Sequence, residues 1–455
     1  MAVDPGENRS WEALERLILE GSKPEVRSFL DRLPVDDVVF AVSRLTDSTR
    51  ARLAELLTLE RAAELVEKIP DAQSIDVLER LEPERSAAIL ERLPSDEQAD
   101  LLGDLSRRDA DAILSEMSPE GADQARALSS YPDDVAGGLM IREYLTYPES
   151  HTAGRVLEDL RANADKYRDY VVQYAYVTRN GRLRGVLRLR DLLFETPGCE
   201  IRKIMLPEPL SVPESLGLDD LRVFFERHPF FGVPVVDSQG RLVGIVTRAA
   251  VEAARADRSD SDYLKTQGIV GGEELRTMPL LLRSRRRLAW LSVNIGLNIL
   301  AASVIALYQE TIAAVIALAV FLPIISDMSG CSGNQAVAVS MRELTLGLVR
   351  PNEVLRVWLK EVSVGMINGI ALGVLIACAA WLWKGNPALG VVVGVAMAIN
   401  TIVAVSIGGV VPLVLRRLNM DPALASGPIL TTLTDMCGFF LLLSLATAVM
   451  PFLVP

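Results

Sequence analysis

The chain has 455 residues, of which half are hydrophobic and 23% are charged, and its formal net charge is −12. This is too apolar for one soluble domain and too charged for a bare bundle of membrane helices, so the sequence must combine two unlike parts. From Leu288 to the end seven acids balance seven bases, so residues 1–287 carry the whole net charge. An acidic cytoplasmic body argues against nucleic acid or anionic lipid as the main partner and leaves cations open.

The rare residue types exclude several classes of protein. Residues 1–11 lack a basic segment followed by an apolar core, so we expect no cleaved signal peptide. The only histidines, His151 and His228, lie far from the apolar tail, which excludes an intramembrane HExxH metalloprotease. Four scattered cysteines, three of them in apolar stretches, predict buried thiols rather than a disulfide or zinc framework. They are Cys199, Cys331, Cys378 and Cys437. No nucleophile with a paired base and no phosphate loop stands out, so we expect no enzyme.

Residues 26–125 repeat with a period of twelve. An apolar residue recurs at each twelfth position, and two more apolar residues stand three and four positions before it. The repeated positions are Leu33, Leu45, Leu57, Ile69, Leu81, Leu93, Leu105 and Met117. Prolines and capping residues between them predict helices of about two turns. Such short helices cannot bury an apolar stripe alone, so we expect a stacked helical solenoid over residues 1–134.

Residues 135–255 contain a second duplication. Residues 170–193 and 230–251 each read as a β-rich run, a turn, Gly-Arg-Leu-x-Gly, a second strand and a helix, with equivalent glycines at Gly181 and Gly240. This predicts two hairpins. The pair resembles tandem CBS domains, over residues 135–196 and 197–255. Arg188 stands where such domains usually have Thr before Asp191, and the second copy keeps Thr247 but lacks the Asp, which argues against nucleotide binding.

A helical stretch and a basic cluster lead into the membrane. Residues 248–287 read as a linking helix and a basic membrane entry that ends in Arg283-Ser284-Arg285-Arg286-Arg287. Residues 288–455 hold five stretches that are long and apolar enough to cross a bilayer. They are Leu288–Gln309, Thr311–Met341, Val362–Trp383, Gly385–Leu415 and Pro422–Pro455. Basic residues on one side place the N-terminus in the cytoplasm and the C-terminus outside. Gly365, Gly369 and Gly373 predict a close-packing helix face.

Two carboxylates, Asp327 and Asp435, fall inside these spans with no Lys or Arg to neutralise them. A carboxylate in the bilayer centre is costly and persists when it is paired, protonated or facing water and ions. Around Asp327, one proline and two glycines within Pro323–Gln335 predict irregular backbone that lines a cavity. Such oxygen-rich surroundings suit a hard cation, and Mg²⁺ in particular because it keeps several of its waters. For Asp327 an equal alternative to a cation site is a position near a helix end, from which the side chain reaches the membrane–water interface.

The order of helical repeats, two CBS modules, a linking helix and five spans resembles the MgtE magnesium channel family over nearly the whole chain. The stretch from Arg416-Arg417 to Thr434-Asp435 is similar to the most diagnostic segment of that family. The resemblance implies a pore formed by a homodimer, in which Asp435 holds hydrated Mg²⁺ with help from Gly333, Asn334 and Gln335. It also implies that Thr431, Gly330 and Gly438 face the ion path. Asp327 has no counterpart in the family, and Cys331 departs from its usual Gly-Gly-Asn run.

The resemblance also implies control by intracellular Mg²⁺, which closes such channels by bridging acids of the helical domain, the CBS pair and the linking helix. Asp96 and Asp100 match the helical-domain part, although a solvated helix face explains this i,i+4 pair equally well. On the linking helix Asp262 remains, but Ala253, Arg258 and Ser261 stand where acids are usual. We therefore expect a weakened or rewired gate. The candidate substitutes are Asp257, Asp260 and Glu252.

These patterns predict a mainly α membrane protein with a short-helix solenoid, tandem α/β CBS domains, a linking helix and a five-helix transmembrane domain. The function expected from them is that of a homodimeric Mg²⁺ channel in the inner membrane, with cytoplasmic domains that sense ions. One alternative is a secondary transporter that couples divalent cations to H⁺ or Na⁺ through Asp327 or Asp435. Another is a membrane-tethered sensor without transport. Selectivity among Mg²⁺, Mn²⁺ and Co²⁺ does not follow from the sequence.

Overall fold

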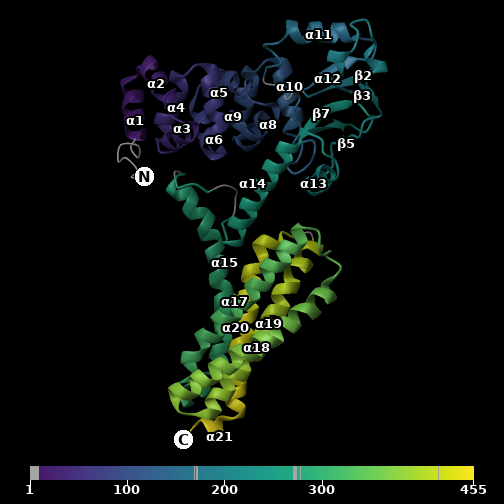
Figure 1. The fold of residues 1–455 in the computed structure, drawn as a ribbon. Helices are drawn as coiled ribbons and strands as arrows, with labels where there is room; N and C mark the ends of the chain where they lie inside the picture. The colour runs from purple at the N-terminus through teal and green to yellow at the C-terminus, as the bar shows by residue number, and fades with distance from the viewer. Residues whose placement is uncertain are drawn as a thin grey trace, which may run out of the picture. The chain divides into compact units, whose positions relative to one another are not determined.

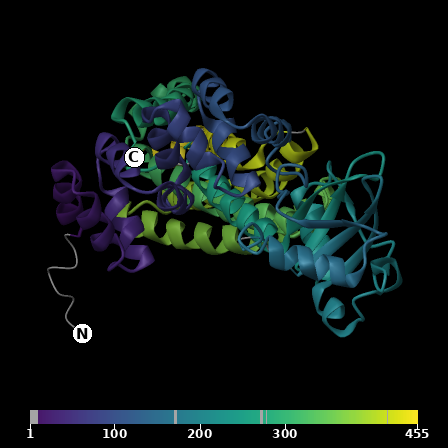
Figure 2. The same cartoon turned by 90° about the horizontal axis from the view of Figure 1, so that it is seen from above.

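The computed structural model describes residues 10–168, 170, 173–269, 274–276, 278–418 and 420–454 (Figure 1). The chain divides into two compact units. The first holds Met1–Arg258 with Leu275–Thr277, and the second holds Ser259–Glu274 with Met278–Pro455. Within the first unit, short helices lie at one end and the strands of two sheets at the other (Figures 1 and 2).

The first unit begins with ten short helices, which confirms the predicted solenoid. They are α1 (Ser10–Glu20), α2 (Lys23–Leu30), α3 (Val35–Ser43), α4 (Asp47–Leu56), α5 (Leu59–Lys68), α6 (Asp71–Arg80), α7 (Pro83–Leu90), α8 (Ser95–Asp104), α9 (Arg107–Glu116) and α10 (Pro119–Leu128). From α4 onward each helix packs mainly on the helix two further along the chain, so even and odd helices form two rows. All the repeated apolar positions except Leu33 are buried.

The predicted capping residues and prolines begin the helices in two ways. Thr46, Thr58 and Ser106 accept a hydrogen bond from a backbone N–H of the following turn, which caps α4, α5 and α9. Pro83 and Pro119 occupy the first helical position of α7 and α10, where a missing N–H costs nothing. Breaks of a few residues between helices therefore come from local chemistry and set the twelve-residue period.

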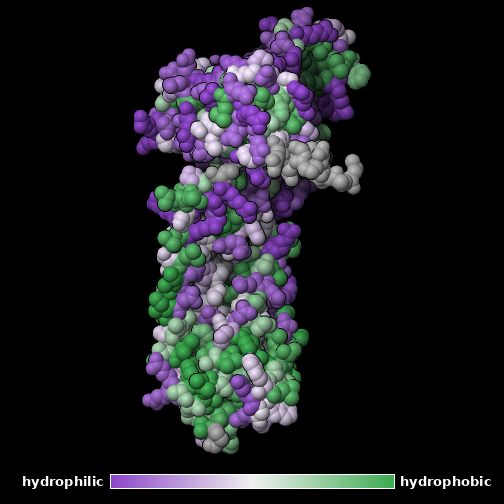
Figure 3. Space-filling view, turned by 90° about the vertical axis from the view of Figure 1, so that its left-hand side faces the viewer, coloured by the Kyte–Doolittle hydropathy of each residue, from purple (hydrophilic) through white to green (hydrophobic). Residues whose placement is uncertain are grey.

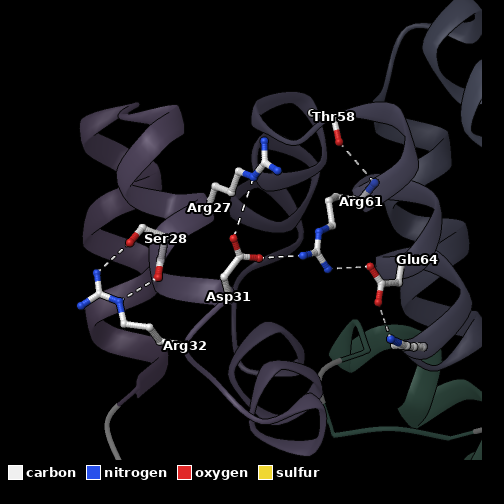
Figure 4. A network of polar contacts seen from close by, with 8 residues as sticks. Arg27, Ser28, Asp31, Arg32, Thr58, Arg61 and Glu64 are labelled. Carbon is white, nitrogen blue, oxygen red and sulfur yellow. Dashed lines mark hydrogen bonds and ion pairs between the residues drawn. The ribbon is translucent and has the colours of Figure 1, made fainter.

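An ion-pair network on the solenoid surface links α2 to α5 (Figure 4). The guanidinium of Arg61 lies 2.7 Å from Asp31 and 2.8 Å from Glu64, and Lys68 lies 2.6 Å from Glu64. Hydrogen bonds from Lys68 and Arg61 lower the pKa of Glu64. Because these side chains are about half exposed, each pair contributes only about 0–1 kcal/mol, and the network mainly orients one helix on the other.

Two α/β modules follow the solenoid. The first has a four-stranded sheet of order β1-β2-β3-β4 and the second a three-stranded sheet of order β5-β6-β7. The strands are β1 (Leu145–Pro148), β2 (Tyr174–Arg179), β3 (Arg182–Arg188), β4 (Leu206–Pro207), β5 (Val212–Pro213), β6 (Gly232–Val236) and β7 (Leu242–Thr247). The helices are α11 (Ala153–Ala162), α12 (Leu189–Phe194), the 3₁₀ helix η2 (Ile201–Lys203), α13 (Leu218–Arg227) and α14 (Arg248–Thr266).

Both predicted hairpins are confirmed. Strands β2–β3 and β6–β7 pair antiparallel, and Gly181 and Gly240 at their turns have φ of +77° and +74°, which only glycine adopts freely. The turns also bind each other, because Leu183 N donates to Gly240 O at 3.2 Å and Leu242 N donates to Gly181 O at 3.1 Å. These reciprocal bonds join equivalent positions of the two copies, so the sequence duplication becomes a pseudo-twofold pair.

The second unit consists of the end of α14 and seven further helices. These are α15 (Leu280–Leu307), α16 (Gln309–Ala314), α17 (Leu318–Thr345), α18 (Val354–Lys384), α19 (Pro387–Arg417), α20 (Pro422–Ala448) and α21 (Met450–Leu453). Among the described residues, four helices are long and apolar enough to cross a membrane, and they are α15, α18, α19 and the part of α20 from Gly427. The remaining predicted span corresponds to α17, whose hydropathy is lowered by Asp327, Asn334, Gln335 and several serines. Helix α19 packs against α17, α18 and α20, so it forms the centre of this bundle, whose visible surface is largely hydrophobic (Figure 3).

The structure differs from expectations for the membrane region and for the cysteines. Pro323–Gln335 is continuous helix inside α17, and the break lies earlier, at residues 315–317 between α16 and α17. The glycines there serve close packing: a Cβ on Gly333 would meet Leu430 at 2.8 Å and Ala404 O at 3.1 Å. The basic cluster is not a separate entry but lies in the first turns of α15. The cysteines are not buried thiols, because Cys331 and Cys378 are exposed and the other two are half-buried.

Candidate cation site

Asp435 lies at the contact between α17 and α20. Its side chain is buried, and its Oδ1 accepts a hydrogen bond from Ser326 Oγ of α17 at 2.5 Å. Ser326 belongs to α17 and Asp435 to α20, so this hydrogen bond joins the two helices. The described part of the chain places no Lys or Arg within salt-bridge distance of this carboxylate. Asp435 is thus a desolvated acid with one neutral donor.

The other polar residues predicted from α17 form an exposed stripe. Asp327, Cys331 and Asn334 follow one another at intervals of four and three residues, so they share one face of the helix, and all three are exposed. Gln335 beside them is exposed as well. Asp327 lies in the middle third of α17 (Leu318–Thr345) and not at its end.

The remaining predicted positions divide into open and packed ones. Thr431 of α20 is exposed, with its hydroxyl donating to Gly427 O at 3.0 Å, and a Cβ on Gly330 would meet no described atom within 4 Å. Gly333 is buried against α19 and α20. Gly438 is buried too, with Asn400 Nδ2 2.6 Å and Ile325 3.1 Å from the place of a Cβ. Within this chain Gly333 and Gly438 therefore serve helix packing.

Asn400 of α19 is a polar residue of this region that the sequence reasoning missed. It is fully buried between α17 and α20, beside Gly438. The available signal was a single amide inside a long apolar span, since buried polar side chains in membrane helices need partners.

Two of the acids predicted to sense ions, Asp96 and Asp100, lie on α8, where the solenoid meets the second CBS-like module. Ala99 of α8 belongs to the hydrophobic core of that module, and Ser95 Oγ donates to Glu143 Oε2 at 2.8 Å. Asp96 is half-buried here, and burial, with the charge of Glu143, raises its pKa. Asp100 still reaches solvent, but partial burial and Asp133 raise its pKa to about 7.

Further acids that the sequence reasoning missed surround this pair. Burial, Glu67 and Asp96 raise the pKa of Glu97 to about 8. Burial, together with the charges of Asp104 and Asp257, raises the pKa of Asp71 on α6. The predicted substitute Asp257 is thereby brought near an acid of the solenoid. The i,i+4 spacing of Asp96 and Asp100 continues to Asp104, which was the signal available in the sequence.

The other predicted acids of the linking helix have different surroundings. Glu252, Asp257 and Asp260 are exposed along α14, and Asp262 lies 3.7 Å from Lys265, which also lies 3.1 Å from Asp421. Glu252 and Asp257 belong to the first unit, whereas Asp260 and Asp262 belong to the second. Among the described residues, no three His, Cys, Asp or Glu side chains are close enough together to hold a metal ion. The acids therefore approach one another without forming a preformed metal cage.

Comparison with known proteins gives this arrangement a family. Models of the "MgtE intracellular N domain", of CBS domains and of the MgtE "divalent cation transporter" match residues 33–134, 135–197 with 201–256, and 322–445. The "Magnesium transporter MgtE" of Thermus thermophilus is 34% identical over 334 residues, which is 72% of this chain and 73% of that protein. The chain belongs to the MgtE family.

Other MgtE proteins extend the match. The "Magnesium transporter MgtE" of Bacillus subtilis is 28% identical over 434 residues, 95% of each chain. A crystal structure of "the cytosolic domain of the Mg2+ channel MgtE in complex with ATP" is 31% identical, with a TM-score of 0.49, and covers 53% of this chain and 99% of its own. The family models and the 34% identical relative confirm the family predicted from the sequence.

The structure shows the contacts of the residues that were examined for a nucleotide motif. Arg188 Nε donates to Asp191 Oδ2 at 2.7 Å, and Arg190 lies 3.6 Å from the other oxygen. Thr247 accepts a hydrogen bond from Ala250 N and so holds the first turn of α14. Asp191 and Thr247 therefore both have partners within the chain. Weak nucleotide binding stays a prediction.

Proposed function

We propose that this MgtE protein is a Mg²⁺ channel whose pore forms between two copies of the chain. The observation that carries the proposal is the exposed polar stripe of α17, Asp327, Cys331, Asn334 and Gln335, next to the buried Asp435. A carboxylate that faces hydrocarbon costs at least ~2.5–3.5 kcal/mol, so this stripe needs water, ions or protein in front of it. A second copy with its own stripe supplies all three.

The same stripe argues for a hydrated divalent cation. Its oxygens come from carboxylates and amides, which are hard ligands, and Mg²⁺ usually keeps several waters and takes few direct carboxylates. A path lined by acids without bases repels anions. The basic residues near the ends of α15, α17, α18 and α19 favour a cytoplasmic N-terminus, an external C-terminus and the inner (plasma) membrane as location. The coarser function, divalent cation transport, is the one in the description of the matched family.

Purified protein in liposomes tests the proposal and separates it from its alternative. For a channel, currents reverse at the Mg²⁺ equilibrium potential and a proton or Na⁺ gradient leaves this potential unchanged. A shift of the reversal potential with the H⁺ or Na⁺ gradient supports a coupled secondary transporter instead. No flux of Mg²⁺, Mn²⁺ or Co²⁺ from a folded protein contradicts transport altogether and favours a sensor.

Cys331 offers a chemical test of the path, because it lies on the stripe one turn from Asp327. We expect a cationic, membrane-impermeant thiosulfonate to abolish most Mg²⁺ flux, and high Mg²⁺ to slow the reaction. The Cys331→Ser variant should be insensitive. Cys378→Ser is the matched control, because Cys378 is exposed on α18 and its removal should leave the block intact. Block that disappears in Cys378→Ser contradicts the assignment of the stripe.

We further propose that the acids on α8 bind intracellular Mg²⁺ and close the channel, with Asp257 replacing part of the missing linking-helix acids. The support is their mutual proximity, which raises several of their pKa values and which a cation relieves. Glu252 and Asp260 are exposed, and Asp262 forms an ion pair with Lys265. We therefore expect Mg²⁺ to close this channel less strongly than it closes ordinary members of the family. The strength of the gate can be measured as protection of residues 248–268 from protease by millimolar Mg²⁺. Protection as strong as in an ordinary member of the family contradicts the expected weaker gate.

The pH dependence of stability gives a further prediction for these acids. With a folded-state pKa of about 8, Glu97 binds its proton in the folded protein at pH values where the unfolded chain has lost it. The parent is therefore stabilised below pH 4.5 and loses this stability as the pH rises towards 8. Without Mg²⁺, Glu97→Gln should raise the unfolding temperature at pH 8 but not at pH 4.5, as followed by circular dichroism of the full-length protein. Glu120→Gln, which changes an exposed acid of α10, is the control, and an equal gain at both pH values contradicts the prediction.

A further inference from the structure

Asn400 stands out in the centre of the bundle because it is a fully buried amide. It lies in α19, whose buried residues are otherwise almost all Val, Leu, Ala and Gly. A burial of this kind is costly unless the amide forms hydrogen bonds. Its bonds therefore indicate what the residue does.

The amide nitrogen of Asn400 joins two other helices. Nδ2 donates to Ser329 Oγ of α17 at 2.7 Å and to the backbone oxygen of Thr434 in α20 at 3.2 Å. The orientation of the amide follows from the second partner, because a carbonyl oxygen accepts only and must face the nitrogen. Asn400 is thus a three-helix junction of α17, α19 and α20.

This junction lies beside the candidate cation ligand. Thr434 directly precedes Asp435, and Ser329 lies one turn after Ser326, which donates to Asp435. Two hydrogen-bonded contacts therefore join α17 to α20 near Asp435. One is the hydrogen bond from Ser326 to Asp435, and the other runs through the amide of Asn400. Together they fix the separation and the rotation of the two helices around the carboxylate.

Gly438 and the amide oxygen add two independent observations. Gly438 lies one turn after Thr434, and a Cβ there would stand 2.6 Å from Asn400 Nδ2, so this approach requires glycine. Asn400 Oδ1 is buried and has no hydrogen-bond partner among the described residues. An apolar residue of similar size would avoid this unpaired acceptor, so packing alone does not account for the amide.

We propose that Asn400 is a positioning residue for Mg²⁺ transport: it holds α17 and α20 at the spacing that aims Asp435 at the ion path. The inference rests on the proposed transport function and adds a residue that does not itself contact the ion. Outer partners of this kind set ligand geometry and typically change metal affinity by about 10–100-fold when removed.

The test compares Mg²⁺ uptake by the full-length protein in liposomes at equal protein density. Asn400→Ala should raise the Mg²⁺ concentration for half-maximal flux about tenfold or more and narrow the preference for Mg²⁺ over Co²⁺. Thr401→Ala is the matched control, because Thr401 is equally buried on the same helix but donates only to Met397 O within it. That variant should keep both values within about twofold, since the only hydrogen bond of its hydroxyl among the described residues stays within α19.

Gly438→Ala disturbs the same contact from the other side, and it should reproduce the change in half-maximal concentration. The double variant should be no worse than the more severe single variant, because both act through one junction. Three results would overturn the proposal. The Asn400→Ala variant changes only the maximal flux, Thr401→Ala has the same effect as Asn400→Ala, or the effects of the two single variants multiply in the double variant. Failure of the proposed function is distinct, because the parent itself then carries no Mg²⁺.

Discussion

Asp435→Asn should lower Mg²⁺ flux at least tenfold without unfolding the protein. Asparagine has the same shape and its oxygen can still accept the hydrogen bond from Ser326, so the contact of α17 with α20 is kept. What is lost is the negative charge. For a divalent ion held through water about 5 Å away, that charge is worth about 2–7 kcal/mol at effective dielectric constants between 80 and 20. The expected loss of flux is therefore at least tenfold, measured by uptake in liposomes.

Two further variants make this result specific. Asp327→Asn removes the exposed acid of the stripe and should reduce Mg²⁺ flux less, because water screens its charge. Glu353→Gln is the matched control, since Glu353 pairs with Arg356 at the start of α18, 3.1 Å away and outside the bundle interior. Its flux should match the parent. If Asp435→Asn conducts Mg²⁺ at the parental rate, the carboxylate does not hold the ion.

Much of the fold could be predicted because its signals are local. In the solenoid, a buried apolar residue follows directly after the last residue of each of three short helices. These residues are Leu57, Ile69 and Leu81, so the repeated apolar position also marks the end of a helix. In the CBS-like modules, Gly181 and Gly240 mark turns that require positive φ. Repeats and turns of this kind depend on neighbouring residues, and a single sequence displays them.

The break within the membrane region could not be predicted in the same way. Pro323 and the glycines of α17 suggested irregular backbone, yet the helix runs through them. Pro323 lies inside the helix and removes a single backbone N–H, its own, and Gly333 allows α19 to approach closely. The same residue types thus break a helix or pack it, and which of the two occurs depends on the neighbouring helix.

The candidate site was predicted in part for a similar reason. Asp435 and Asp327 were identifiable because a charge in a span is anomalous in any context. Asn400 was not, because its role depends on α17 and α20 meeting around it. The group of Asp71, Asp104 and Asp257 likewise comes from three separate helices, α6, α8 and α14, and only folding brings these acids together.

Glycine-to-alanine substitution should change the free energy of unfolding in opposite directions at Gly369 of α18 and at Gly296 of α15. A Cβ on Gly369 would stand 2.7 Å from the backbone oxygen of Ala398, and one on Gly373 would stand 2.7 Å from Gly394 O. Because the obstacle is backbone, α18 and α19 must separate along their contact. Gly369→Ala should therefore lower the free energy of unfolding by about 1–3 kcal/mol. Titration of the purified protein with denaturing detergent, followed by circular dichroism, measures this loss.

Gly296 of α15 is the matched control, because it is also a glycine of an apolar helix but a Cβ there meets no described atom within 4 Å. Gly296→Ala only removes backbone freedom from the unfolded chain, so it should raise the free energy of unfolding by roughly 0.5–1 kcal/mol. Opposite signs at the two positions identify close helix contact as the reason for the glycine spacing. If both variants are stabilised equally, the glycines of α18 are not needed for its packing on α19, and the buried Gly365, Gly369 and Gly373 require another explanation.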